Sequence, residues 1–217
     1  MNVIEYNFEH YNTLPPNLYR KEKYRLQVEL LKLQEDAISN KRKIAVCFEG
    51  RDTAGKSSTI NFFSEHLIPS NFKYVHLGIP TDEEKANWFK RWEKHLPKKG
   101  ELVLFDRSWY TRALIEPTLG YCTKTEYKKF MNKVNKWEKN LIKSDIELIK
   151  FYFSIDQDQQ KRRLSARKNS KLKYWKLSKS DQMMVDKWDL FTLYKNQMFD
   201  ITSTKIAPWV VVNANNK

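Results

Sequence analysis

An eight-residue glycine-rich motif constrains the fold more than any other part of this sequence. Residues 50–57 read GRDTAGKS and match the pattern GxxxxGK[ST] in full. A short apolar run, 44–48, precedes the motif, and 58–66 has the pattern of a helix. In this order of strand, loop and helix, backbone amides and a helix N-terminus surround a phosphate group. The motif therefore predicts an α/β fold with a phosphate-binding loop.

Further strands and helices alternate along the chain. The apolar runs typical of strands are 44–48, 73–77, 102–105, 147–153 and 209–212. Three capping boxes, in which a hydroxyl precedes an acid or amide by three residues, predict helix starts at Thr81, Thr123 and Ser154. Alternating strands and helices form βαβ units. We expect a three-layer P-loop fold: a five-stranded parallel sheet, helices on both faces, and ligands at the carboxyl ends of the strands.

Length and composition favour one domain. The 217 residues fit a single domain, 1–217, with an N-terminal turn and helix in 1–40 and a core in 41–217. No apolar run approaches the roughly 20 residues of a membrane helix, and the start lacks the pattern of a signal peptide. The two cysteines are too few for a disulfide framework. We expect a cytoplasmic protein without a membrane segment.

The glycine-rich motif supplies a set of candidate phosphate ligands. They are Gly50, Thr53, Ala54, Gly55, Lys56 and Ser57. Lys56 adds a point charge, which we expect on an exposed loop, and Ser57 adds a hydroxyl that can ligate a metal. A carboxylate at Asp52 disfavours polyanion binding unless a cation or a transferable proton lies between the two, and Mg²⁺ is the simplest cofactor to expect. The alternative is an aspartate that only hydrogen-bonds its own turn.

The third predicted strand ends at a second acidic position. Asp106 follows four apolar residues, which is where an acid that holds Mg²⁺ belongs, and Arg107 beside it can neutralise transferring oxygens. An aspartate that only caps the next helix is the alternative. Arg112 and Glu116 follow four residues apart, so they can share a helix face and pair near the same site. A plain surface ion pair explains them equally well.

Positive charge is concentrated near the C-terminal part of the chain. The net charge is +14, and 161–179 holds nine cations without an acid. Surfaces normally mix acids with bases, so this stretch predicts a basic lid over phosphates at about 160–180. The candidate polyanion ligands in it are Arg162, Arg163, Arg167, Lys171, Lys173 and Lys176. A plain basic surface is the alternative.

Two long motifs resemble the polyphosphate kinase 2 family. Residues 49–58, EGRDTAGKSS, are similar to the family's EGRDAAGKGG, and 105–116, FDRSWYTRALIE, to its FDRSWYNRAGVE. The resemblance implies a P-loop kinase fold like that of thymidylate kinase. It also implies reversible, Mg²⁺-dependent transfer of a terminal phosphoryl group between inorganic polyphosphate and a nucleoside diphosphate, which converts ADP or GDP to ATP or GTP.

The resemblance also extends to individual residues. The positions that fall on family motifs are Asp52, Lys56, Asp106, Arg107, Arg112, Glu116, Arg162, Arg163 and Arg167. We expect a catalytic set of Asp52, Lys56, Asp106, Arg107, Arg112 and Arg163, and we assign Glu116 to the nucleotide side. The departures are Thr111, Leu114–Ile115 and Ser57–Ser58, which leave the nucleobase open. The family commonly continues past the position of Lys217, and we expect a homo-oligomer.

Two other functions compete with this interpretation. A nucleoside monophosphate kinase resembling thymidylate kinase has a similar phosphate loop. The substrates of such a kinase carry few charges, however, and do not require a protein with a net charge of +14. A nucleic-acid-binding module also suits a basic surface. That module leaves Asp106 and the motif at 50–57 unexplained, so we do not expect a nucleic-acid partner.

Overall fold

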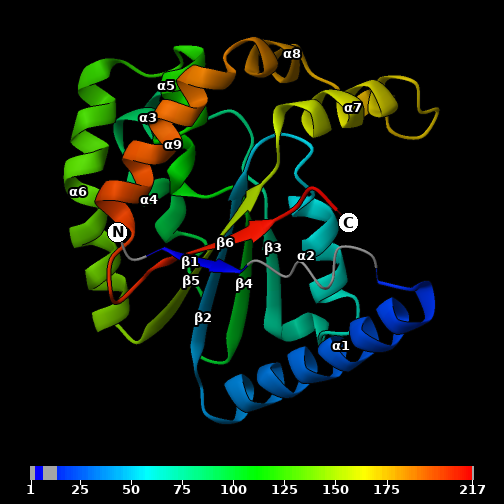
Figure 1. Cartoon of the computed structure of the whole chain (residues 1–217). Helices are drawn as coiled ribbons and strands as arrows, with labels where there is room; N and C mark the ends of the chain where they lie inside the picture. The colour runs from blue at the N-terminus through cyan, green and yellow to red at the C-terminus, as the bar shows by residue number, and fades with distance from the viewer. Residues whose placement is uncertain (1–2, 7–13, 217) are drawn as a thin grey trace.

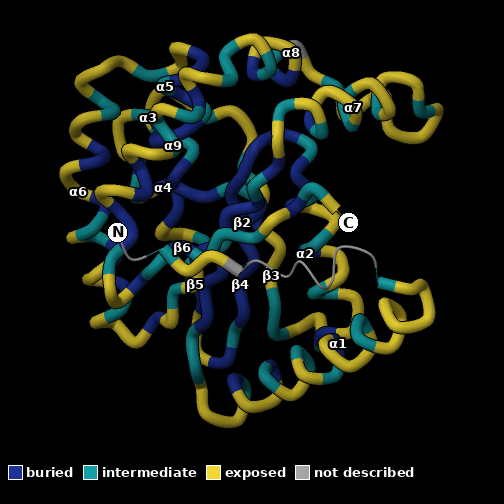
Figure 2. Tube along the Cα trace, viewed as in Figure 1, coloured by how far each residue is buried: buried dark blue, intermediate teal, exposed yellow. Residues whose placement is uncertain are grey.

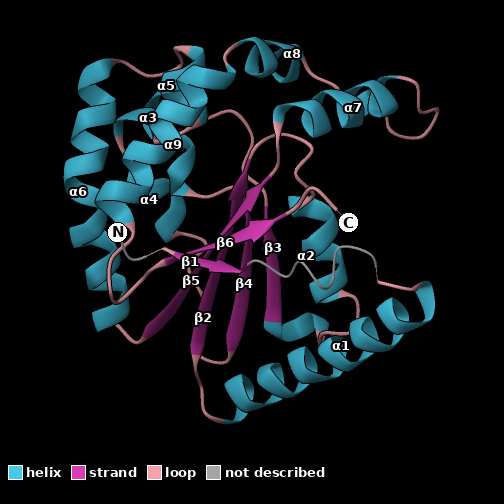
Figure 3. Ribbon diagram, viewed as in Figure 1, coloured by secondary structure: helices cyan, strands magenta, loops and turns pink. Residues whose placement is uncertain are grey.

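A six-stranded parallel sheet forms the centre of the computed structural model, which describes residues 3–6 and 14–216 (Figures 1 and 3). Its strands run in the order β1-β6-β5-β2-β4-β3, and every neighbouring pair is parallel. The strands are β1 (Ile4–Tyr6), β2 (Lys43–Gly50), β3 (Phe72–Val75), β4 (Glu101–Asp106), β5 (Ile146–Ser154) and β6 (Trp209–Asn213).

The prediction of five strands is wrong by one, because β1 was missed. Ile4 pairs with Val210 and Tyr6 with Val212, so β1 adds an edge to the sheet beside β6. A strand of three residues shows no periodicity in the sequence. Its partner lies at the other end of the chain, and nothing local in the sequence marks this pairing.

Helices connect the strands. They are α1 (Pro16–Ser39), α2 (Lys56–Ser64), α3 (Asp82–Ala86), α4 (Trp88–Glu93), α5 (Ile115–Leu119), α6 (Lys124–Lys143), α7 (Gln157–Lys168), α8 (Lys179–Asp186) and α9 (Trp188–Thr202). Short 3₁₀ turns are η2 (Pro69–Asn71), η3 (Trp109–Arg112) and η4 (Tyr174–Lys176). The expected turn and helix in 1–40 correspond to Pro15 and α1, although 1–2 and 7–13, like Lys217, lie outside the described residues.

The sheet is covered on both faces, as its apolar strands predict. Side chains of one face, such as Cys47 and Phe105, pack with Trp92 of α4 and Val134 of α6. Those of the opposite face, such as Phe48 and Leu104, pack with Ala37 of α1 and Ile60 of α2. Figure 2 shows β2 and β4 mostly buried, with helices around the sheet that are exposed on their outer sides. Two apolar layers therefore fix the sheet and the loops at its edge.

Capping chemistry sets where several helices begin. Thr81 and Thr123 form the predicted capping boxes of α3 and α6. The box predicted at Ser154 is wrong: β5 continues through that residue, and the Asp156 side chain accepts the hydrogen bond from the Gln159 amide that caps α7. Aspartate caps a helix as well as serine does. The sequence therefore contained two candidate N-caps for α7, Ser154 and Asp156, two positions apart.

Residues 157–186, called here the α7–α8 arm, lie over the carboxyl ends of the strands (Figure 1). The arm contains α7, η4 and α8 and joins the sheet through β5 at one end and α9 at the other. The predicted basic stretch falls within it. Among the helices of the described ranges, none is long and apolar enough to cross a membrane.

Candidate functional site

The phosphate loop connects β2 to α2 at the carboxyl edge of the sheet. Its first residue, Gly50, has φ +141°, and a Cβ there would lie 2.5 Å from the carbonyl oxygen of Phe153. A side chain is therefore excluded where the loop leaves the sheet. Gly55 also has a positive φ, +105°, and forms the N-cap of α2. Gly55 and the first residues of α2 line the cavity, which is where phosphate binding requires a helix N-terminus.

Lys56 is buried rather than exposed, which corrects the sequence-based expectation. It is the first residue of α2, and its Nζ donates to the carbonyl oxygens of Gly50 at 3.0 Å and Arg51 at 2.9 Å. Burial and the nearby Arg107 lower its pKa, while Asp52 raises it. The ammonium group thus lies inside the loop, and its hydrogen bonds to the two carbonyl oxygens hold the loop backbone curved around it.

Asp106 ends β4 beside the start of α2. The hydroxyls of Ser57 and Tyr74 both donate to its Oδ2, the second at 2.7 Å. His76 stacks on Tyr74, and its Nδ1 lies 3.2 Å from the backbone oxygen of Asp106. Burial raises the pKa of Asp106, but Lys56 and the two hydroxyls outweigh burial and hold it below its ordinary value. The carboxylate is therefore fixed through one oxygen and ionised at neutral pH.

Arg107 joins the two motifs across the cavity. Its backbone has φ +67°, its amide donates to the carbonyl oxygen of Phe48 at 3.1 Å, and its guanidinium forms an ion pair with Asp52. Beneath this pair, the buried carboxylate of Glu49 accepts from the Ser108 amide at 2.6 Å and from its hydroxyl at 2.8 Å. Both contacts connect the end of β2 to the turn after β4.

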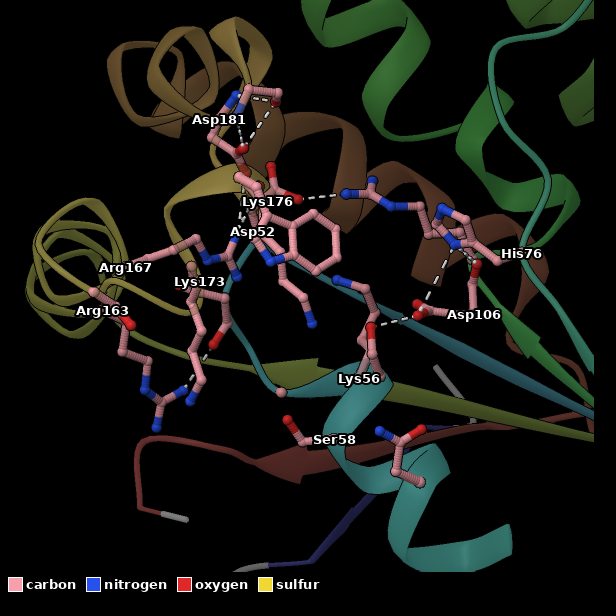
Figure 4. Close-up of a pocket in the computed structure, with 18 of the residues that line it drawn as sticks. Asp52, Lys56, Ser58, His76, Asp106, Arg163, Arg167, Lys173, Lys176 and Asp181 are labelled. Atoms are coloured by element: carbon pink, nitrogen blue, oxygen red, sulfur yellow. Dashed lines mark hydrogen bonds and ion pairs between the residues drawn. The ribbon is translucent and has the colours of Figure 1, made fainter.

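The α7–α8 arm supplies the other side of the cavity (Figure 4). Arg163 lines it and donates to the carbonyl oxygens of Thr53, Ala214 and Asn215 at 2.8–3.1 Å. Arg167 lies 3.8 Å from Asp181 and donates to a carbonyl of the arm. Arm and loop residues that were far apart in the sequence thus meet around one space.

The cavity has a volume of about 780 Å³ and carries an excess of positive charge. Its acids are Asp52, Asp106 and Asp181, and its cations are Lys56, Arg107, Arg163, Arg167, Lys173 and Lys176. Six cations against three carboxylates make a site for a polyanion. Tyr174 and Trp175 stay exposed in the arm, and Trp175 also lines the cavity.

Six of the expected residues lie outside this cavity lining, and two of them, Gly50 and Ala54, belong to the phosphate loop itself. Arg162 and Lys171 are exposed on the arm. Arg112 and Glu116 are buried together, with Nε and Oε2 2.5 Å apart, and the Arg112 guanidinium also lies over the Trp88 ring. Their predicted pairing is confirmed, but as an interior contact among α4, η3 and α5 rather than on the surface.

Other residues of the site were missed by the sequence analysis. Tyr74 lies in β3 and His76 directly follows it, and their contact with Asp106 depends on β3 lying beside β4. The only signal was their spacing of two residues. This spacing predicts that both side chains lie on the same face of a strand, but it does not identify the neighbouring strand. Arg51, a loop residue that contacts α9, and Gln160 of α7 are also buried, and the sequence analysis assigned a role to neither.

The donor set suits Mg²⁺ that arrives with phosphate. Within the described residues, no cluster of three or more histidine, cysteine, aspartate or glutamate side chains forms a metal cage. Mg²⁺ in phosphate-transfer sites usually takes one or two carboxylates and completes its shell with water and substrate oxygens. Asp52, Asp106 and the hydroxyl of Ser57 provide such a partial set beside the loop.

A parallel sheet with a GxxxxGKS loop between strand and helix, and a basic arm over its carboxyl edge, defines a phosphate-binding P-loop protein. The sequence model of one family, polyphosphate kinase 2 (PPK2), matches residues 14–217. The chain belongs to the polyphosphate kinase 2 family.

Individual relatives agree with this assignment. The chain is 42% identical over 212 residues to a GDP-polyphosphate phosphotransferase of Pseudomonas aeruginosa, covering 97% of this chain and 59% of that protein. It is 45% identical to NDP-polyphosphate phosphotransferase 2 of Ruegeria pomeroyi, covering 92% of this chain and 58% of the relative. The chain therefore spans less than two thirds of the length of these two relatives.

A solved structure supports the fold. The crystal structure of polyphosphate kinase 2 from Arthrobacter aurescens superposes with a TM-score of 0.86 at 30% sequence identity. The superposition covers 94% of this chain and 74% of the other. The sheet and its surrounding helices are thus an arrangement shared with a family member of known structure.

Proposed function

We propose that this chain transfers a phosphoryl group between inorganic polyphosphate and a nucleoside diphosphate. The observation that carries the proposal is the single cavity that joins a phosphate loop, two ionised aspartates and a basic arm. The printed names of its relatives, GDP-, NDP- and ADP-polyphosphate phosphotransferases, support the same substrates. ADP or GDP is then the acceptor, and ATP or GTP the product.

The reaction needs little acid-base chemistry from the protein. In the direction of nucleotide synthesis, an oxygen of the acceptor's terminal phosphate bonds to the terminal phosphorus of polyphosphate, and the bridging P–O bond to the next phosphate breaks. The acceptor oxygen is largely deprotonated at pH 7, so no general base is required. Positioning and charge neutralisation do most of the catalysis.

The charges of the cavity suit these two tasks. Lys56 and Arg107 lie where they can neutralise the transferring oxygens, since both border the loop. Arg167, Lys173 and Lys176 approach from the arm, where they grip the following phosphates of the polymer. We infer that the arm acts as a lid over the polymer.

We assign magnesium to the loop side of the cavity. The chemistry that Mg²⁺ would supply there is partial neutralisation of the phosphate charge. Asp52 and Asp106 would hold the ion with Ser57, and their lowered pKa values keep both carboxylates ionised. Ser57 and Tyr74 fix Asp106 through Oδ2, so the orientation of this carboxylate is set before substrate arrives.

Other parts of the proposal rest on the family resemblance. Glu116 and Arg112 belong to a family motif, and we infer that their buried pair shapes the nucleotide side of the site. A homo-oligomer and a cytoplasmic location, where nucleoside diphosphates are available, complete the proposal.

Incubation of the chain with polyphosphate and Mg²⁺, separately with ADP and GDP, tests this function. Phosphorus NMR should show a nucleoside triphosphate appearing as terminal polyphosphate is consumed. An enzyme that instead phosphorylates dTMP from ATP and leaves polyphosphate untouched would make the monophosphate kinase alternative correct. Binding of RNA without any transfer reaction would favour the nucleic-acid alternative.

A further inference from the structure

Three successive residues of the phosphate loop contact α7, which begins the α7–α8 arm, and the start of α9, which directly follows the arm. The side chain of Arg51 reaches α9, which follows the arm. The carbonyl oxygens of Asp52 and Thr53 accept hydrogen bonds from Gln160 and Arg163 of α7, at 3.2 and 3.1 Å. The loop therefore sits between the two points where the arm joins the rest of the molecule.

Arg51 forms the contact at the C-terminal end. Its guanidinium carbon lies 3.3 Å from the centre of the Trp188 ring and 4.4 Å from that of Phe191. One terminal nitrogen also donates to the Trp188 carbonyl at 3.1 Å and to the Thr192 hydroxyl at 2.6 Å. The residue is only 4% exposed, so its planar group is held on a ring face and by two hydrogen bonds.

Arg51 keeps its charge in this position. Burial lowers its pKa to about 10, which leaves the group protonated at neutral pH. The other terminal nitrogen is buried without a hydrogen-bond partner. Arg51 does not line the phosphate cavity, so its side chain serves the contact with α9 rather than the substrate.

Gln160 forms the contact at the N-terminal end. Its side chain is fully buried in the second turn of α7, and its amide nitrogen donates to the Asp52 carbonyl. Between the two ends, 171–176 are exposed throughout. The arm is therefore attached firmly at both ends and loosely in the middle.

We propose that Arg51 and Gln160 are positioning residues that fasten both ends of the α7–α8 arm to successive residues of the phosphate loop, so that phosphate bound by the loop also orders the arm. The proposal rests on phosphate binding at this loop, as in the proposed function. It assigns to Arg51 a role that its place in a phosphate-binding motif does not indicate.

Hydrogen exchange measured by mass spectrometry, with and without inorganic phosphate and Mg²⁺, tests the coupling, because a single phosphate offers the arm no following phosphates to grip. In the wild type, inorganic phosphate should slow exchange in the loop, 50–58, and in the arm, 170–187, each by on the order of tenfold. In Arg51→Met, which keeps the aliphatic stem, the loop should still be protected while the arm is not. Arg51→Lys should behave like Arg51→Met. Lysine keeps the charge, but it has no planar guanidinium group to stack on the Trp188 ring while donating hydrogen bonds.

Two further variants separate coupling from general destabilisation. Trp188→Leu removes the same contact from the α9 side and should also lose arm protection, and it carries the test if Arg51→Met does not fold. Arg162→Met removes an exposed arginine of the arm outside the cavity lining, and both protections should remain. Gln160→Leu should release the N-terminal end, so that protection of 157–168 falls selectively.

Each remaining outcome contradicts the coupling. Arm protection that survives in both Arg51→Met and Trp188→Leu would overturn it. Loss of loop protection together with arm protection would overturn it too, because Arg51 would then act in phosphate binding itself. A wild type with a protected loop and an unprotected arm refutes only this inference, whereas a wild type with no loop protection also refutes the proposed function.

Discussion

Asp52 of the phosphate loop and Arg107 at the end of β4 form an ion pair although 55 positions separate them in the chain. Burial raises the pKa of Asp52, but Arg107 and Lys56 outweigh burial and hold it below its ordinary value. Because the carboxylate stays ionised, it can bind a cation in addition to pairing with Arg107. The pair thus links the two motifs that the sequence marks for phosphate chemistry.

Replacing Asp52 with asparagine should weaken the response to Mg²⁺. The amide keeps the shape of the carboxylate and loses the charge, so the Mg²⁺ concentration for half-maximal rate should rise by on the order of tenfold or more. Asp181→Asn changes a carboxylate of the same cavity, on the arm, and serves as the control. An Asp52→Asn enzyme with the Mg²⁺ titration of the wild type would remove the metal role.

Lys173 and Lys171 form a matched pair on the arm, since only Lys173 lines the cavity. Lys173→Ala should raise KM for polyphosphate several-fold, leave KM for ADP nearly unchanged, and reduce the dependence of polyphosphate affinity on salt. Lys171→Ala, which we also expected to matter from the sequence, should have a much smaller effect. Equal effects of both substitutions would mean that the basic arm acts through net charge alone.

Arg163 and the neighbouring Arg162 offer a second comparison. Arg163 lines the cavity and holds the Thr53 carbonyl, whereas Arg162 is exposed. Arg163→Ala should lower kcat by at least about tenfold, and by on the order of 10³-fold if it touches the transferring oxygens. A kcat equal to that of Arg162→Ala would show that Arg163 has no part in the transfer step.

Glu49 should make stability depend on pH in a distinctive direction. Burial raises its pKa above the ordinary value of about 4.3, so the folded protein binds this proton more tightly than the unfolded chain does. The free energy of unfolding should therefore fall, relative to Glu49→Gln, as the pH rises from about 4 until the folded pKa is passed.

Glu147 provides the opposite case for the same measurement. Its hydrogen bond from Arg42 lowers its pKa, so its contribution to stability grows as the pH rises. Urea unfolding measured between pH 4 and 7 tests both predictions. As the pH rises, the free energy of unfolding of Glu49→Gln should increase relative to that of the wild type, and that of Glu147→Gln should decrease. Parallel pH profiles for the wild type and Glu49→Gln would contradict this account of the buried carboxylate.

The sequence predicted those parts of the fold whose signals are local. The loop at 50–57 lies in one unbroken segment, and the capping boxes at Thr81 and Thr123 each need only four residues. Five strands were long enough to show as apolar runs. β1 was missed because three residues at an edge have no pattern of their own, and Ser154 was mistaken for a cap because Asp156 offers the same chemistry.

Residues that depend on strand order or packing could not be placed from the sequence. Lys56 was expected to be exposed because the sequence motif reveals only that the residue is charged. It does not reveal that loop carbonyl oxygens surround the ammonium group. Tyr74 contacts Asp106 only because β3 lies beside β4. Arg51 looked like one more loop residue, and its partner Trp188 is 137 positions away.

We propose that the loop and the basic arm together transfer a phosphoryl group between polyphosphate and a nucleotide. The most direct measurement is ATP formed from ADP, Mg²⁺ and polyphosphate by the wild type and by Lys56→Met, which keeps the length of the buried side chain. We predict ATP in proportion to wild-type enzyme, and a loss of at least about 10²-fold in Lys56→Met, whose fold is checked by circular dichroism. No ATP or GTP from either diphosphate, or equal turnover by a folded Lys56→Met, would contradict the claim.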